Sequence, residues 1–174
     1  MKTSVLEWVN SSGGPLVCGD KEAVSDWKGT AGFSGSKFGQ KGTDYQSSCL
    51  VNDYVGHMDG YGNSIVVLGD EPLQTAFFHT FTEDLAIARW IYADPSVDIN
   101  KELRSFTESD SLQPAVTLEI ASGSIVIFDA SVEFKNCSSS IIEGINPGLY
   151  KLTSEKFQIG RKYSFLIHRI LPAA

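Results

Sequence analysis

A turn-rich stretch near the start of the chain, SSGGPL at residues 11–16, is the first place where phosphate chemistry could be expected. A phosphate-binding loop needs glycines in a longer frame, then Lys and Ser or Thr, then a helix, so that backbone N–H groups face the anion. No such Lys follows here, and Pro15 lacks the N–H that the loop would offer. We therefore interpret Gly13, Gly14 and Pro15 as a turn.

Three side chains near residue 55 have the chemistry of metal ligands. Asp53, His57 and Asp59 would share one face of an extended strand, because their positions have the same parity. Val55 lies on that face as well, and no second group of ligands follows. A metal-assisted hydrolase centred on His57 is therefore kept only as the last alternative.

The cysteines offer little chemistry. Cys49 could be paired with a histidine, but no nucleophile motif surrounds it. Cys18, Cys49 and Cys137 are odd in number, far apart and without a CxxC pair. Neither a disulfide framework nor a zinc site is indicated, and we expect reduced, mostly buried thiols.

Paired carboxylates occur in GDEP at 69–72 and in TED at 82–84, a residue type that glycosidases use as acid and base. Asp beside Gly and Pro more commonly accepts backbone N–H groups in turns, and we favour that role here. No catalytic residue, metal or cofactor is predicted.

The charge of the chain indicates its partner class. The 174 residues carry a formal net charge of −7, and residues 61–110 hold nine Asp or Glu against three Lys or Arg. An acidic surface repels nucleic acid and attracts a basic protein. We therefore expect a protein partner and no direct binding of nucleic acid.

The size and apolar content of the chain predict one globular domain over residues 1–174. The first 20 residues hold no apolar run typical of a signal peptide, and no later stretch approaches the ~18 apolar residues of a membrane span. We expect a cytoplasmic protein that does not bind membranes.

The elements that must position these groups are mainly β strands. Six segments rich in β-branched and aromatic residues are separated by turn residues, and each is expected to form a strand. They are CLVNDYVGHMD (49–59), NSIVVLG (63–69), LAIARWIYA (85–93), AVTLEIA (115–121), SIVIFDASVEF (124–134) and KYSFLIHRIL (162–171). The pattern predicts a mainly β fold, α+β at most, built as an antiparallel sandwich or open barrel with two short helices.

Hairpins are expected where turn residues separate two strands, at Ser122-Gly123 and at the NPG of 146–148. The Gly/Ser/Lys-rich segment at about 30–43 is expected to be a flexible loop.

Two segments have the pattern of short helices. The first is expected within 20–29, with Asp20 as N-cap and Val24 and Trp27 on one face. The second is expected over 94–106, with Asp94 as N-cap.

Six motifs occur in a characteristic order: WVNSSGGPL (8–16), WKG (27–29), DYQSSC (44–49), VLGDEPLQTAF (67–77), ARWIYAD (88–94) and LEIASGSIVIFDAS (118–131). Together they resemble the Immunity protein 21 family of bacterial polymorphic toxin systems. The resemblance implies family positions, expected to be structural, at Trp8, Gly13, Gly14, Pro15, Trp27, Gly29, Tyr45, Cys49, Trp90 and Tyr92.

The resemblance implies a mostly β cytoplasmic protein that binds and neutralises a cognate toxin and is not an enzyme. Many such toxins are nucleases with basic clefts, so an acidic inhibitor would complement them. The hypothesis of stoichiometric inhibition places toxin contacts at Asp70, Glu71, Glu83, Asp84, Asp94, Asp98 and Glu102.

The main alternative is a small-molecule-binding β module. It predicts a deep apolar pocket at the mouth of a barrel, lined by several of the ten Phe residues.

Overall fold

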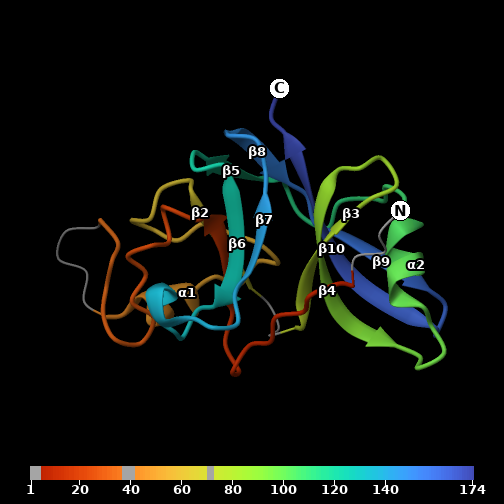
Figure 1. Ribbon diagram of the computed structural model, residues 1–174, viewed down its shortest axis with the longest axis horizontal. Coiled ribbons are helices and arrows are strands. Elements are labelled where there is room, and N and C mark those ends of the chain that lie inside the picture. The colour runs from red at the N-terminus through yellow and green to blue at the C-terminus, as the bar shows by residue number, and fades with distance from the viewer. Residues whose placement is uncertain (1–4, 37–41, 70–72) are drawn as a thin grey trace.

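The computed structural model describes residues 5–36, 42–69 and 73–174, which form two antiparallel sheets (Figure 1). The four-stranded sheet has the order β2-β1-β6-β7 and the six-stranded sheet has the order β3-β4-β10-β8-β5, with β9 paired to β10. The strands are β1 (Leu16–Asp20), β2 (Ile65–Leu68), β3 (Thr75–His79), β4 (Leu85–Ala93), β5 (Val116–Ile120), β6 (Ser124–Asp129), β7 (Ile141–Gly144), β8 (Gly148–Leu152), β9 (Glu155–Ile159) and β10 (Tyr163–Pro172).

Two short α helices and one 3-10 turn accompany the sheets: α1 (Asp44–Ser48), α2 (Ile99–Arg104) and η1 (Phe134–Asn136). The expected mainly β, antiparallel fold with two short helices is confirmed. The two sheets face each other and do not close into a barrel.

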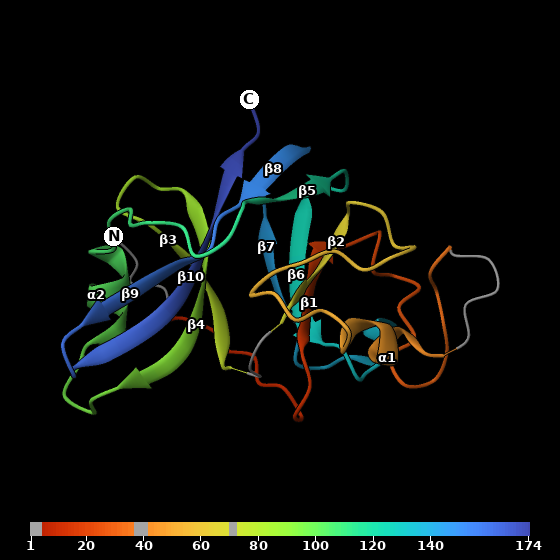
Figure 2. The ribbon, with the colours of Figure 1, turned by 180° about the vertical axis from the view of Figure 1, so that it is seen from behind.

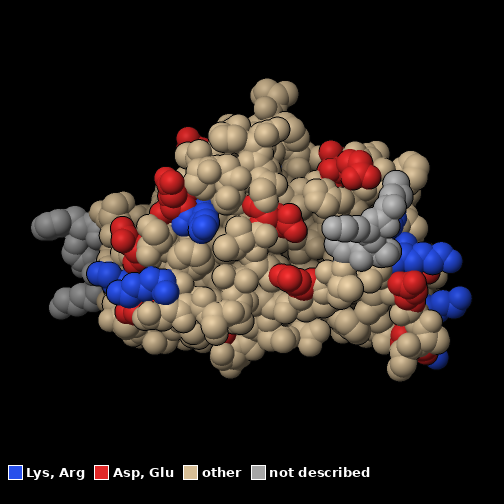
Figure 3. Space-filling model, viewed as in Figure 1, with Lys and Arg blue, Asp and Glu red and all other residues tan. Residues whose placement is uncertain are grey.

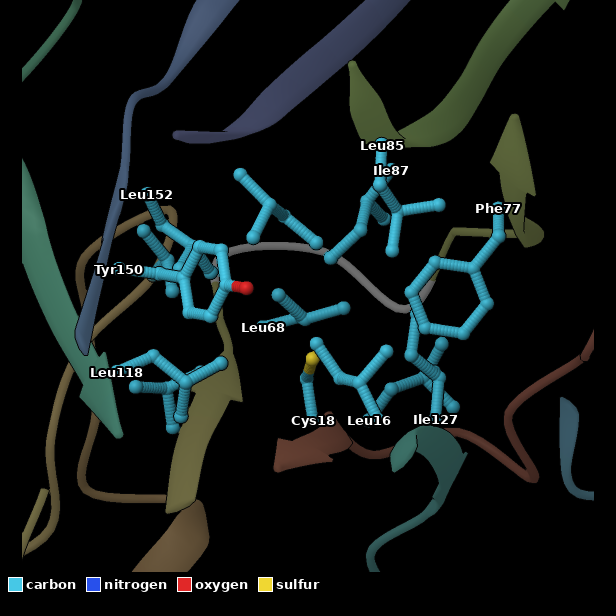
Figure 4. Close-up of a cluster of buried hydrophobic side chains, with 14 of the residues drawn as sticks. Leu16, Cys18, Leu68, Phe77, Leu85, Ile87, Leu118, Ile127, Tyr150 and Leu152 are labelled. Atoms are coloured by element: carbon cyan, nitrogen blue, oxygen red, sulfur yellow. The ribbon is translucent and has the colours of Figure 1, made fainter. Parts of the chain in front are cut away.

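The space between the sheets is filled by apolar side chains from both of them, as Figure 4 shows. Leu16 and Cys18 of β1 point towards Phe77 and Ile87 of the opposite sheet. Side chains alternate between the two faces of a strand, so only every second residue enters this central core. In β6, Ile127 belongs to it.

The intervening residues are also apolar, and they bury the outer faces of the sheets. Val126 and Phe128 of β6 pack with Trp27 on the outside of the four-stranded sheet. On the outside of the six-stranded sheet, Phe165 packs with Leu103 of α2. The views from front and back place α1 and α2 at opposite ends of the molecule (Figures 1 and 2).

The predicted helix within 20–29 is wrong, because the segment forms consecutive turns after β1. The Asp20 carboxylate does accept the N–H groups of Glu22 and Ala23, as a helix cap would. One helical bond follows, from Val24 N to the Asp20 carbonyl, and then Ser25 N and Trp27 N bond carbonyls only three residues back, in tighter turns. Asp20 belongs to β1 and Trp27 inserts into the outer core, so too few residues remain for a helix.

The two predicted hairpins are also wrong, because each connects strands of different sheets. The turn at Ser122-Gly123 joins β5, which pairs with β8, to β6, which pairs with β1 and β7. The turn at 146–148 likewise joins β7 to β8. Ile145 N donates to the Gly123 carbonyl at 3.1 Å, so the two corners lie together. The chain thus crosses from one sheet to the other between β5 and β6 and again between β7 and β8, and these two crossings are adjacent.

Two further boundaries differ from expectation. Residues 49–59 form a loop rather than a strand, apart from the bridge between Gly56 and Val67. Helix α2 begins at Ile99, with Asp98 as its N-cap, because residues 94–98 form turns that precede it. The described flanks of the expected loop at 30–43 are anchored, since Asp44 N donates to the Gly32 carbonyl.

Asp20 holds the first corner in place. Its carboxylate accepts the N–H groups of Ala121 and Ser122 at 2.9 and 2.7 Å, in addition to its two bonds in the turn after β1. Burial alone would raise the pKa of this carboxyl, but the hydrogen bonds from Ser122, Ala23 and Ala121 outweigh it and keep the pKa below its ordinary value. The charged form is therefore the one that stabilises the fold.

We expect Asp20→Asn to lower the free energy of unfolding by about 2 to 3 kcal/mol, since an amide leaves one acceptor for four donors. Folding lowers this pKa, so the contribution is present at neutral pH and is lost as the pH falls through the folded value. Urea unfolding at pH 7 and below about pH 4 measures both effects. Asp26→Asn, at an exposed position in the same turns, is the control, and an equal loss for both variants would contradict this role.

Candidate functional site

The WKG motif fastens the turns of 21–30 to the end of β6. The indole Nε1 of Trp27 donates to the Ala130 carbonyl at 2.9 Å. Gly29 has a φ of 55°, and a Cβ at this position would overlap the Ser131 carbonyl. Trp27 is buried against the outer face of the four-stranded sheet. Both motif residues therefore serve close packing.

A buried carboxylate that the sequence patterns did not single out, Asp44, organises the neighbouring loop. It accepts the Lys28 N–H and the Ser34 N–H at 2.7 Å each, the Ser34 hydroxyl at 2.8 Å and the Tyr61 hydroxyl at 2.6 Å. Burial and this bond both raise the pKa of Tyr61. The sequence does contain a local sign of this residue, since Thr43 and Gln46 form a capping box that places Asp44 at the start of α1.

The SSGGPL turn meets the same region. Its Ser12 donates through both backbone N–H and hydroxyl to Asp129 at 2.7 Å. Burial would raise the pKa of Asp129, but these bonds lower it below its ordinary value. Gly13 has a φ of 124°, and a Cβ on Gly14 would lie 2.6 Å from the Tyr45 ring. Both donors of Ser12 are thus occupied by a carboxylate of the same chain, at the end of β6.

Five family positions from separate segments converge on one small cavity of about 270 Å³. It is lined by Gly13, Gly14, Pro15, Tyr45, Cys49, Val51, Asn52 and Gly69. The structure therefore brings the SSGGPL and DYQSSC motifs together.

Contrary to the expectation of mostly buried thiols, Cys49 is exposed and Cys137 is half-buried, while Cys18 is buried.

The remaining family positions lie on the other sheet. Trp8 and Trp90 pack edge to face, with ring centroids 5.5 Å apart. The Tyr92 hydroxyl donates to the Gly160 carbonyl at 3.0 Å. These residues attach the N-terminal segment and the β9–β10 turn to β4, which again is a packing role.

Between the sheets lies a polar pair, Arg89 and His168. Arg89 donates to the carbonyls of Tyr54 and Gly69 at 3.1 and 2.8 Å, and His168 Nδ1 lies 3.0 Å from the Ser154 hydroxyl. Burial and the nearby Arg89 charge lower the pKa of His168 to about 3, so the imidazole is neutral. Both side chains are enclosed by the core, which removes them from contact with a substrate.

The acidic residues predicted to contact the toxin are divided by the structure. Glu83 and Asp84 lie in the β3–β4 turn, whereas Asp94 follows β4, at the far end of a nine-residue strand. Such a strand spans roughly 30 Å. Asp70 and Glu71 lie outside the described residues.

Several of these carboxylates have partners within the chain. Asp98 caps α2 by accepting the Lys101 N–H at 3.2 Å, and Glu102 accepts the Tyr163 hydroxyl at 2.9 Å. Asp84 accepts the Thr82 hydroxyl, and Asp94 accepts from Ser96. On the face shown in Figure 3, Asp and Glu side chains form separate groups rather than one continuous patch.

A groove of about 790 Å³ lies between the N-terminal segment, β3, α2 and β7. Its apolar lining includes Val5, Phe81 and Ile142, which are 82%, 84% and 46% exposed. Its charged lining consists of Glu7, Glu83, Glu143 and Arg104. Of the five described residues predicted to contact a toxin, Glu83 alone lines this groove. The sequence patterns did not identify the remaining residues of the groove, because these residues lie far apart in the chain.

A groove with exposed apolar side chains and an acidic rim has the character of a protein-binding surface. Interfaces gain affinity from apolar anchors and gain speed and specificity from complementary charge. We take this groove as the candidate functional site.

The geometry expected for a metal site does not form. Residues 53–59 follow a loop, so the parity that would align Asp53, His57 and Asp59 does not apply. His57 Nε2 lies 2.7 Å from the Thr117 carbonyl. Within the described ranges, no three His, Cys, Asp or Glu side chains are grouped to hold a metal ion.

The barrel mouth expected for a small-molecule module does not form either, since the sheets stay open and apolar side chains fill the space between them. No helix in the described part of the chain is long and apolar enough to cross a membrane.

A family model described as Immunity protein 21 matches residues 7–162. This range includes both groups of motif residues and most of the groove. Comparison with curated proteins and with solved structures finds no match.

We expect Gly29→Ala to lower the free energy of unfolding by about 3 kcal/mol, because it combines left-handed strain with overlap against backbone. Gly62→Ala is the matched control, since Gly62 also has a positive φ, 69°, but a Cβ there meets nothing within 4 Å. It should cost about 1 kcal/mol. Urea unfolding compares the two, and equal losses would rule out a packing role for the WKG glycine.

Proposed function

Because this chain belongs to the Immunity protein 21 family, we propose that it binds a cognate bacterial toxin and neutralises it as a stoichiometric inhibitor. The observation that carries the proposal is the family match over residues 7–162. The proposal places the protein in the cytoplasm of the bacterium that makes the toxin.

The use of polar residues in the fold supports inhibition by binding. Asp20, Asp44 and Asp129 are buried and accept hydrogen bonds from backbone and hydroxyl groups. His168 is enclosed and neutral. These groups stabilise loops and corners, and the groove supplies exposed surface for a partner.

The charge of the chain supports a basic partner. The net charge of −7 and the glutamates of the groove would attract a cationic surface. A nuclease has such a surface where it holds the phosphate backbone. We therefore propose a nuclease-type toxin domain whose basic face meets the groove.

The test uses the toxin domain encoded beside this chain, purified in a catalytically inactive form. At low salt, Glu83→Lys with Glu143→Lys should slow association roughly tenfold, because both reversals face the groove. Glu119→Lys with Glu22→Lys is the matched control, since both positions are exposed outside the groove and the change in net charge is the same. Surface plasmon resonance at several salt concentrations measures the rates, and the difference should shrink as salt rises.

Two negative results have different meanings. If the wild-type protein forms no complex and gives no protection, the immunity function itself is wrong. If a complex forms and the double reversal in the groove associates at the wild-type rate, only the assignment of the groove is wrong.

A further inference from the structure

Strand β3 is an edge of the six-stranded sheet, and part of its outer side is open. Trp90 N donates to the Gln74 carbonyl and Thr80 N donates to the Asp84 carbonyl, so even-numbered residues of this region bond β4. Hydrogen-bonding direction alternates along a strand. The backbone groups of Thr75, Phe77 and His79 therefore face away from β4.

The described part of the N-terminal segment, from Val5 onwards, covers one of these three positions. Val9 and Thr75 exchange both hydrogen bonds, at 2.8 and 3.0 Å. Continuing that register would pair Glu7 with Phe77 and Val5 with His79. In the described structure, neither pair is joined by a backbone hydrogen bond. All four residues line the groove instead.

Two other edge strands, β5 and β2, carry backbone partners on their outer sides. On β5, at the opposite edge of the same sheet, Glu119 N donates to the Asn63 carbonyl and the Thr117 carbonyl lies 2.7 Å from His57 Nε2. On β2, Val67 exchanges two hydrogen bonds with Gly56. Folded proteins usually cover or blunt a strand edge, because an open one pairs readily with another chain. The open part of β3 therefore requires an explanation.

We propose that an extended, cationic segment of the toxin adds as a strand to β3 at Phe77 and His79, inside the groove. This inference rests on the proposed immunity function and specifies how the partner is held. Main-chain hydrogen bonds would supply affinity, and pockets beside the edge would select alternate side chains. Phe81 and Ile142 offer apolar contacts for one set of those side chains.

The charge of the groove identifies the occupant. Among the described residues that line it, three glutamates, Glu7, Glu83 and Glu143, stand against one arginine, Arg104. Lys or Arg side chains of an added strand would lie against these carboxylates. A second copy of this chain would bring the same acidic rim to the contact, and like charges would oppose that pairing.

His79 allows a direct test, because its N–H faces the open side and its side chain is exposed. His79→Pro removes the donor without breaking the ladder to β4. His79→Ala keeps the donor and removes the same contact of the imidazole with the Glu83 carbonyl. We expect the Kd for the inactive toxin domain to rise at least tenfold for His79→Pro, against no more than about threefold for His79→Ala.

Hydrogen exchange on the wild-type proteins keeps the test independent of folding in the proline variant. The amides of Phe77 and His79 should exchange at least tenfold more slowly in the complex than in the free protein. A complex that leaves both amides unprotected, or a folded His79→Pro variant with the Kd of the wild type, would overturn strand addition. The absence of any complex would instead reject the immunity function.

Discussion

The need to bury both faces of the same strands is the constraint on which this structure depends. In β6, Ile127 faces the central core, while Val126 and Phe128 face outwards. A two-layer sandwich would leave the outward residues in water, at a cost of about 1.5 to 3 kcal/mol for each large side chain. The four-stranded sheet therefore packs one face against the six-stranded sheet and the other face against additional chain segments. The turns that carry Trp27 are one of these segments.

This layering explains how the buried carboxylates are used. Chain segments that cover a sheet without strands or long helices leave backbone N–H groups unpaired, and unpaired buried groups are costly. Asp20, Asp44 and Asp129 accept such N–H groups at three places where the chain leaves a strand or enters a loop. Buried carboxylates are common in catalytic sites, but these three stabilise the scaffold.

The proposed function uses a surface that the scaffold leaves incomplete. The N-terminal segment follows β3 only as far as the Val9–Thr75 bridge and then diverges, which opens the groove beside Phe77. A preformed surface suits the proposed inhibitor, because preorganisation lowers the cost of binding. The strand edge, the exposed apolar side chains and the acidic rim are held by elements from four distant parts of the chain.

The sequence by itself determined the class of the fold. Alternation and β-branched content located β4 at Leu85–Ala93, placed β5 and β6 within predicted segments and located β10 to within one residue at each end, because these patterns are local. The motif order indicated the Immunity protein 21 family, since it needs only residue types and spacing.

Only the tertiary structure decided which strands pair. The turns at Ser122-Gly123 and 146–148 have hairpin chemistry, yet both cross between sheets, because Asp20 from β1 binds one corner and Gly123 binds the other. The groove was equally beyond reach, since Glu7, Glu83 and Glu143 come together only when β3 and β7 meet across the sandwich. Contacts between residues so far apart in the chain depend on the whole packing and leave no local pattern.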